Sequence, residues 1–184
     1  MMTQLTEQQI TLIPVTKEEL PLLKQELQEA FMKGLQESFP EQTDPSEMGP
    51  IPSDEDFQQS LTAKDSVVRQ LVLNGERIGG VVVQINQATQ RNEVHFLYMK
   101  ANAHGKGLGT KAWTAIEAAF PETNIWELHT PYFEKRNIHF YVNKCGFNIV
   151  EFYHRGNPGP NANWEEPKSD ADYEFFRFEK VMKK

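Results

Sequence analysis

The stretch His104-Gly105-Lys106-Gly107-Leu108-Gly109-Thr110 constrains the fold more than any other part of the sequence. It follows an apolar run, Val94 to Met99, and precedes a segment with apolar residues at helical spacing, Leu108 to Ala119. Closely spaced glycines let a backbone fold tightly round an anion, and a helix N-terminus offers unpaired N–H groups and the positive end of its dipole. The sequence therefore predicts a strand, a phosphate-binding loop and a helix in this order.

The spacing of the glycines limits the ligands that fit such a loop. A dinucleotide-binding loop needs G-x-G-x-x-G and a P-loop needs G-x-x-x-x-G-K-[ST], whereas this loop reads G-K-G-L-G-T-K. A nucleotide-binding regulatory domain is disfavoured by these mismatches and by the antiparallel strands predicted before the loop. An ordinary loop at the entry to a helix stays open as the alternative to an anion site.

Composition limits the classes of partner. With 184 residues the chain suits a single domain over residues 1–184. Its net charge of −7 argues against nucleic acid and anionic membranes, because those surfaces select clusters of Lys and Arg. A single cysteine, Cys145, allows no internal disulfide, and no Cys/His cluster offers ligands for a metal. Residues Met1 to Gln9 lack a signal-peptide pattern, so a cytoplasmic protein is expected, and a homodimer stays open.

Hydrophobic periodicity and turn residues predict the remaining elements. Asn74-Gly75 indicates a hairpin, because both turn positions need positive φ. Strands are expected at Thr11 to Val15, Val67 to Leu73, Arg77 to Asn86, Glu93 to Lys100, Ile125 to His129, Phe147 to His154 and Tyr173 to Met182. Helices are expected from Leu20 to near Pro40, from Asp54 to Ala63 with Ser53 as the cap, from Leu108, and from Glu134 to Lys144.

The loop and this order of elements resemble the GNAT superfamily of N-acyltransferases. The acyl-CoA signature of that family, [QR]-x-x-G-x-[GA] after a strand of the form L-x-V, is matched at Leu97, Met99, Gly107 and Gly109. His104 stands where the family usually has Gln or Arg. The resemblance implies an α/β (α+β) fold with a mixed, mostly antiparallel seven-stranded sheet, about four helices, and fourth and fifth strands that run parallel and splay apart.

The same resemblance implies acetyl-CoA as the co-substrate, without a metal. The pantetheine arm would fill the gap between the splayed strands. The pyrophosphate would lie on the loop, whose cofactor-binding residues are His104, Gly105, Lys106, Gly107, Leu108, Gly109 and Thr110. A second part of the resemblance is Asn137-Ile138-His139-Phe140-Tyr141 before Gly146-Phe147, where the family pattern N-x-x-x-Y-x-x-x-G-F has one residue fewer.

This second motif implies that Asn137 contacts the cofactor and that Tyr141 protonates the departing thiolate. Asn137 and Tyr141 are four residues apart and so share a helix face. The alternative is that Phe140 and Tyr141 only pack the helix on the sheet.

Acetyl transfer to an amine also calls for a base, because an amine of pKa near 10.4 is almost fully protonated at pH 7. Glu93 stands at the offset of the catalytic glutamate in histone-modifying members of the family, and His95 points to the same strand face. Each is a candidate base, directly or through water. The alternatives are a solvated hairpin residue for Glu93 and a structural histidine for His95.

These features predict an N-acetyltransferase that moves an acetyl group from acetyl-CoA to a primary amine of a small molecule or peptide, by direct attack in a ternary complex. Acidic residues between Glu41 and Asp56 and between Glu165 and Asp172 would attract a cationic acceptor, or they serve solubility alone. The alternative function is a non-catalytic acyl-CoA-binding or sensing module of the same fold.

Overall fold

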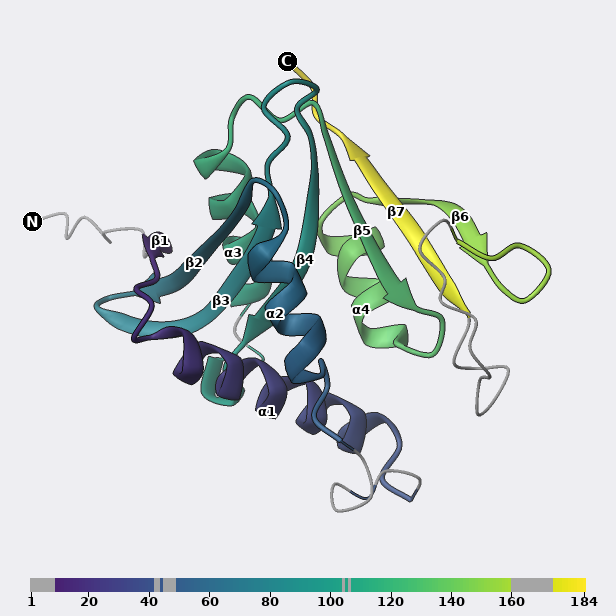
Figure 1. The fold of residues 1–184 in the computed structure, drawn as a ribbon, viewed down its shortest axis with the longest axis horizontal. Coiled ribbons are helices and arrows are strands. Elements are labelled where there is room, and N and C mark those ends of the chain that lie inside the picture. Colours follow the sequence, from purple (N-terminus) through teal and green to yellow (C-terminus); the bar gives the residue numbers. More distant parts are fainter. Residues whose placement is uncertain (1–8, 42–43, 45–48, 104, 106, 160–173) are drawn as a thin grey trace, which may run out of the picture. The chain divides into compact units, whose positions relative to one another are not determined.

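A computed structural model of the chain describes residues 9–41, 44, 49–103, 105, 107–159 and 174–184 (Figure 1). The elements are β1 Thr11–Pro14, α1 Leu20–Ser38, α2 Asp54–Thr62, β2 Ser66–Leu73, β3 Glu76–Gln84, β4 Arg91–Met99, α3 Leu108–Ala119, β5 Ile125–Pro131, α4 Lys135–His139, β6 Asn148–Tyr153 and β7 Phe175–Val181. A 3-10 turn, Ala101–Ala103, follows β4, and a π-helical turn, Phe140–Lys144, continues α4. The predicted order of strands and helices is confirmed.

The strands form a seven-stranded sheet in the order β1-β2-β3-β4-β5-β7-β6. β1 with β2, β2 with β3, β5 with β7 and β6 with β7 pair antiparallel, whereas β4 and β5 pair parallel. The parallel pairing joins only Arg91–Glu93 to Ile125–Glu127, so β4 and β5 splay apart beyond it. These features confirm the predicted fold class. The chain divides into two compact units.

The first, called here the N-terminal unit, comprises Met1–Gln84 and Phe96–Pro121. Helix α1 begins at Leu20 with Pro21 in its first turn, and the Glu19 carboxylate accepts a hydrogen bond of 2.9 Å from the Thr16 backbone N–H. Ser53 caps α2 as predicted, since its hydroxyl accepts from the Asp56 N–H. The core of this unit contains Leu23, Leu27, Phe57, Val82 and Tyr98.

The β2–β3 hairpin turns at Asn74 and Gly75, whose φ values of 52° and 80° confirm the predicted turn. Gly79 on β3 is needed for a different reason. A Cβ there would lie 2.2 Å from the backbone oxygen of Tyr98, so a side chain at this position would push β3 and β4 apart.

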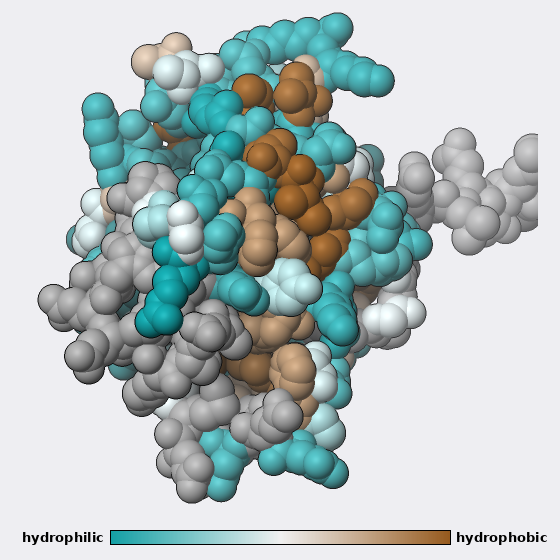
Figure 2. Space-filling model, turned by 90° about the vertical axis from the view of Figure 1, so that its right-hand side faces the viewer, coloured by the Kyte–Doolittle hydropathy of each residue, from teal (hydrophilic) through white to brown (hydrophobic). Residues whose placement is uncertain are grey.

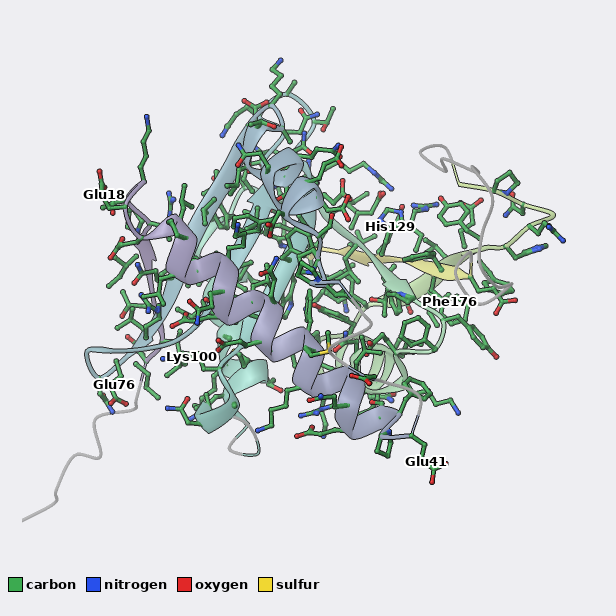
Figure 3. The ribbon with its side chains drawn as sticks, turned by 60° about the horizontal axis from the view of Figure 1, so that its bottom comes forward. Glu18, Glu41, Glu76, Lys100, His129 and Phe176 are labelled. Carbon is green, nitrogen blue, oxygen red and sulfur yellow. The ribbon has the colours of Figure 1, made fainter. Side chains whose placement is uncertain are left out.

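The second, called here the C-terminal unit, comprises Ile85–His95 and Glu122–Lys184. Alternation along its strands separates two faces of the sheet. One face carries buried Trp126, Leu128 and Phe178, whereas the other carries Glu93, Glu127 and Arg177. Figure 3 shows His129 and Phe176 on opposite sides of the β5–β7 ribbon.

Strand β6 closes the sheet at one edge. Its residues Ile149, Val150 and Phe152 are among the large hydrophobic residues exposed to solvent. Figure 2 shows the side of the molecule on which β6 lies in Figure 1, where apolar residues gather at the surface. The edge strand β6 therefore exposes apolar side chains, and it also carries Glu151, which pairs with Arg177.

Candidate active site

The glycine-rich loop enters helix α3 in the N-terminal unit. Gly105 and Gly107 have φ values of 79° and 68°, and Gly107 is the N-cap of the helix. A Cβ at either position would meet no neighbouring atom, so the left-handed backbone and not a lack of space calls for glycine. Gly109 already lies in the first turn of α3, which has no acidic side chain. The helix N-terminus therefore offers its N–H groups and dipole without a carboxylate in its own first turn.

The other predicted cofactor residues of this unit lie on the same loop or on β4. Leu108 is buried and Thr110 is exposed at the start of α3. Leu97 and Met99 are half-buried on β4 and alternate with the buried Tyr98. His104 and Lys106 lie outside the described residues. The left-handed glycines Gly105 and Gly107 and the start of α3 suit an anion, and the binding of such a ligand stays a prediction.

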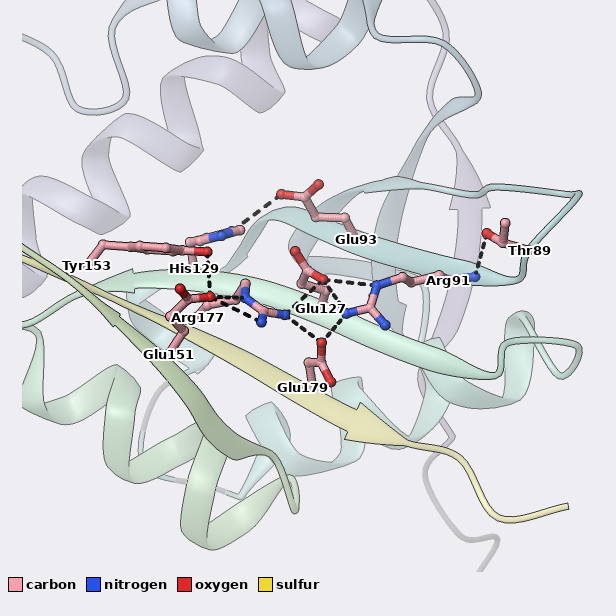
Figure 4. Close-up of polar contacts among 9 residues, drawn as sticks. All are labelled: Thr89, Arg91, Glu93, Glu127, His129, Glu151, Tyr153, Arg177 and Glu179. Atoms are coloured by element: carbon pink, nitrogen blue, oxygen red, sulfur yellow. Dashed lines mark hydrogen bonds and ion pairs between the residues drawn. The ribbon is translucent and has the colours of Figure 1, made fainter. Parts of the chain in front are cut away.

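Glu93 lies on β4 in the C-terminal unit, opposite Glu127 in the last registered β4–β5 pair. Its carboxylate oxygen is 3.5 Å from Nδ1 of His129, and the two side chains are 36% and 34% exposed (Figure 4). Burial raises the pKa of Glu93, but the hydrogen bond from His129 and the charge of His95 outweigh it and leave the pKa below its ordinary value. Glu93 is therefore ionised at neutral pH and available to hold a cation or an N–H group.

His95 follows Glu93 by two residues on β4 and is half-buried. Burial lowers its pKa, Glu93 raises it, and His129 lowers it further, with a net shift below the ordinary value. A neutral imidazole at pH 7 is what a base requires, so the candidate role of His95 stays a prediction.

An ionic network covers the rest of this face across β4, β5, β7 and β6 (Figure 4). Arg91 contacts Glu127 at 2.9 Å and also Glu179. Arg177 contacts Glu127, Glu179 and Glu151, the last at 3.3 Å. We call these five residues the arginine network. Burial lowers the pKa of Arg177, but its carboxylate neighbours outweigh this and raise it, so both arginines stay charged.

Helix α4 and its π-helical turn carry the second family motif. Asn137 lies in α4 and is half-buried, and Tyr141 lies in the π-helical turn. The Cys145 N–H donates to the Phe140 carbonyl at 3.0 Å, five residues back, so this turn contains one residue more than an α-helical turn. The π-helical turn thereby accommodates the residue that this chain has, beyond the family pattern, between Tyr141 and Gly146. Gly146 still ends the helix, with a φ of 81°.

The Tyr141 ring is buried and packs between neighbouring aromatic rings. Its centroid is 5.6 Å from that of Phe147 and 6.2 Å from that of Phe178 on β7. Burial raises the pKa of Tyr141 and the neighbouring Cys145 raises it further, so the hydroxyl keeps its proton at neutral pH. The packing role is observed, and the role as a proton donor stays a prediction.

Sequence reasoning missed His129 and Tyr153. Their rings stack with centroids 6.0 Å apart and planes 20° apart, and the Tyr153 hydroxyl donates to Glu151 at 3.1 Å. His129 had a usable signal, because it is the last residue of the predicted fifth strand, next to the strand of Glu93. Tyr153 had none, because its contact depends on the positions of β6 and β7.

Two kinds of site are not found in the described part of the chain. It contains no group of His, Cys, Asp and Glu residues able to hold a metal ion. None of the described helices is long and apolar enough to cross a membrane.

The comparisons with known proteins agree with this class of fold. The model of the acetyltransferase (GNAT) family matches residues 25–147. The chain therefore belongs to the GNAT family of acetyltransferases, which confirms the resemblance inferred from the loop and the order of elements. An uncharacterized protein of Bacillus subtilis (strain 168), YrkN, is 46% identical over 182 residues, which cover 97% of this chain and 96% of that protein.

Solved structures share the fold at low sequence identity. An acetyltransferase from Thermus thermophilus superposes with a TM-score of 0.64 at 15% identity, covering 95% of this chain and 97% of that chain. The spermidine N-acetyltransferase of Vibrio cholerae, solved in complex with CoA and spermine, superposes with a TM-score of 0.62 at 14% identity, covering 94% and 95%. These likenesses show the fold and leave the acceptor of this chain to be inferred from its own residues.

Proposed function

We propose that this protein is an N-acetyltransferase that moves an acetyl group from acetyl-CoA to a primary amine of a small molecule or peptide. The proposal is carried by Gly105 and Gly107, two left-handed glycines before α3, and by the first turn of α3, which has no acidic side chain. Membership of the GNAT family and the CoA bound in the Vibrio cholerae structure support the choice of anion.

The residues proposed to bind acetyl-CoA are given for each unit separately. In the N-terminal unit they are Leu97, Met99 and the loop from His104 to Thr110, and the loop amides take the pyrophosphate. In the C-terminal unit Asn137 contacts the cofactor from α4. Beyond Glu127, the edge of β5 toward β4 has no strand pairing in the described residues, and the pantetheine arm would satisfy its backbone groups.

The proposed reaction is a direct attack within a ternary complex. The neutral amine nitrogen adds to the thioester carbonyl carbon, one N–H proton leaves to a base, and the C–S bond breaks. On β4, Glu93 and His95 are the candidates for removing this proton, directly or through water. Tyr141 gives its proton to the CoA thiolate. A thiol has a pKa near 8.5, so this last step needs only modest assistance.

The test compares two substitutions at Gly109, which lies in the first turn of α3. Gly109→Ala should bind acetyl-CoA like the parent, because alanine suits a helix. Gly109→Glu suits the helix N-terminus equally well but places a negative charge against the pyrophosphate. We expect its Kd by isothermal titration to rise at least about tenfold, or 1.4 kcal/mol.

The parent is then assayed for acetyl-CoA consumption with polyamines, aminoglycosides, amino acids and peptide N-termini. Equal affinity of the two folded Gly109 variants for acetyl-CoA would show that the site is wrong. Tight binding without turnover of any amine would contradict the enzyme and favour an acyl-CoA-binding module.

A further inference from the structure

Glu93 differs from the other glutamates described on its sheet face. Glu127, Glu151 and Glu179 each contact at least one arginine, whereas the side-chain contact of Glu93 is His129. An arginine is always charged and cannot take up a proton, but an imidazole changes protonation near neutral pH. Glu93 is therefore the carboxylate on this face that is coupled to a group able to transfer a proton.

The His129 ring is held from two directions. Its Nδ1 faces Glu93 on β4, and its plane lies against Tyr153 on β6. Tyr153 is held in turn by its hydrogen bond to Glu151, which is fixed by Arg177. When Nδ1–H donates to Glu93, Nε2 carries the lone pair of the neutral ring. In the described residues Nε2 makes no hydrogen bond.

His129 also lies close to the last registered pair of β4 and β5. It follows Glu127, the last β5 residue paired with β4, by two positions and so points to the same face at the start of the splay. About one third of its side chain is exposed, so solvent and a ligand reach the ring.

We propose that His129 is the base that takes the proton from the acceptor amine, and that Glu93 is a positioning residue that acts through His129. This proposal rests on the N-acetyltransferase function. As the amine nitrogen bonds to the thioester carbon, its proton passes to Nε2, and the imidazolium that forms is stabilised by the Glu93 carboxylate. The C–S bond then breaks, the thiolate is protonated, and His129 returns its proton to solvent.

The separation between Nδ1 and the carboxylate is longer than an ideal hydrogen bond, as is common for catalytic pairs without substrate. The ionised state of Glu93 supports its role as the positioning residue and that of His129 as the base. A carboxylate with a lowered pKa is a weak base toward an amine, but it is well suited to hold a tautomer and to stabilise a cation.

The kinetic test is a double-mutant cycle with a panel amine that the parent turns over. His129→Asn keeps an N–H donor near Glu93 but has no basic nitrogen, and we expect kcat/KM to fall about 10²- to 10³-fold. Glu93→Gln should fall roughly tenfold, equivalent to one pKa unit of lost charge stabilisation. The double variant should match His129→Asn, because Glu93 acts only through His129.

The matched control is His154→Asn, the same substitution directly after β6, where the imidazole accepts a hydrogen bond from the Gly156 N–H. It should keep the kcat/KM of the parent. A larger loss for Glu93→Gln than for His129→Asn, or losses that multiply in the double variant, would overturn the assignment.

A spectrum of the free protein gives a second readout, independent of turnover. In the nitrogen-15 imidazole spectrum of the neutral protein, the His129 signals, identified by their absence in His129→Asn, should show the Nδ1–H tautomer. The Nε2–H tautomer, which free imidazole side chains favour in water, would overturn the pairing. Absence of turnover by the parent with every amine would instead overturn the N-acetyltransferase function and the base role together.

Discussion

Two glutamates, Glu26 in the N-terminal unit and Glu93 in the C-terminal unit, show how differently a folded chain uses a carboxylate. The Glu26 side chain is 10% exposed and is held by Arg77 at 2.8 Å, Lys100 at 3.5 Å and the Tyr98 hydroxyl at 2.9 Å. Glu93 is 36% exposed and has His129 at 3.5 Å. A largely covered carboxylate with three partners fixes the structure, whereas a partly exposed carboxylate beside an imidazole remains available for chemistry.

The largest expected effect is a loss of stability when the Glu26 carboxylate is removed. Glu26→Gln leaves Arg77 and Lys100 without their carboxylate, and we expect the free energy of unfolding to fall by about 2–4 kcal/mol. Urea unfolding followed by circular dichroism measures the loss. The kcat/KM of the protein that remains folded should equal that of the parent.

The control for Glu26 is Glu29→Gln, on the same helix but exposed, which should change stability by no more than about 0.5 kcal/mol. Equal stability losses for the two variants would show that the contacts of Glu26 contribute nothing beyond those of a surface residue.

A smaller effect is expected at the arginine network. The Arg177 side chain is 21% exposed, which lies between the exposures of Glu26 and Glu93. Arg177→Gln should reduce the unfolding free energy by about 1–2 kcal/mol, since its contacts are partly solvated. It should also lower kcat/KM a few-fold, because Arg177 fixes Glu151, which holds the Tyr153 ring against His129.

Arg91→Gln is the matched variant for this prediction, because Arg91 shares Glu127 and Glu179 with Arg177, whereas the ion pair to Glu151 comes from Arg177. It should cost less than about 1 kcal/mol and leave kcat/KM unchanged. An equal loss of activity in both variants would show that the support does not run through Tyr153.

The parts of this molecule that the sequence predicted are those set by local chemistry. The Asn74–Gly75 turn, the Ser53 cap and the glycine loop before α3 each depend on the backbone preferences of a few adjacent residues. The order of elements followed from hydrophobic periodicity. From that order, the family resemblance supplied the parallel, splayed β4 and β5, which the β4–β5 register confirms.

The contacts that could not be predicted depend on how distant strands align. The pairing of Glu93 with His129 depends on the parallel register of β4 and β5, and a shift of one residue would turn His129 to the other face. The stack on Tyr153 further depends on an irregular register between β6 and β7 near Glu151. In the helix predicted from Glu134 to Lys144, the sequence showed one residue more than the family pattern. It did not show that a π-helical turn accommodates this residue.

The smallest expected effect is on how the stability contributed by Glu93 changes with pH. It follows from the direction in which the pKa of Glu93 is shifted. Because the pKa of Glu93 in the folded protein lies below its ordinary value of 4.5, the ionised carboxylate contributes stability above that pH. This contribution is lost as the pH falls through the lowered pKa. Glu93→Gln lacks it at every pH, so the parent should be slightly more stable than Glu93→Gln at pH 7, and the difference should shrink below about pH 4.5. The difference is small because the side chain is partly exposed and solvent screens its charge.

Urea unfolding midpoints of the parent and of Glu93→Gln, at pH 7 and below about pH 4.5, measure this difference. The Glu29→Gln variant corrects for the removal of a surface carboxylate. A difference that grows in acid would mean that the folded protein disfavours the charge of Glu93, which would also remove the physical basis for pairing it with an imidazolium.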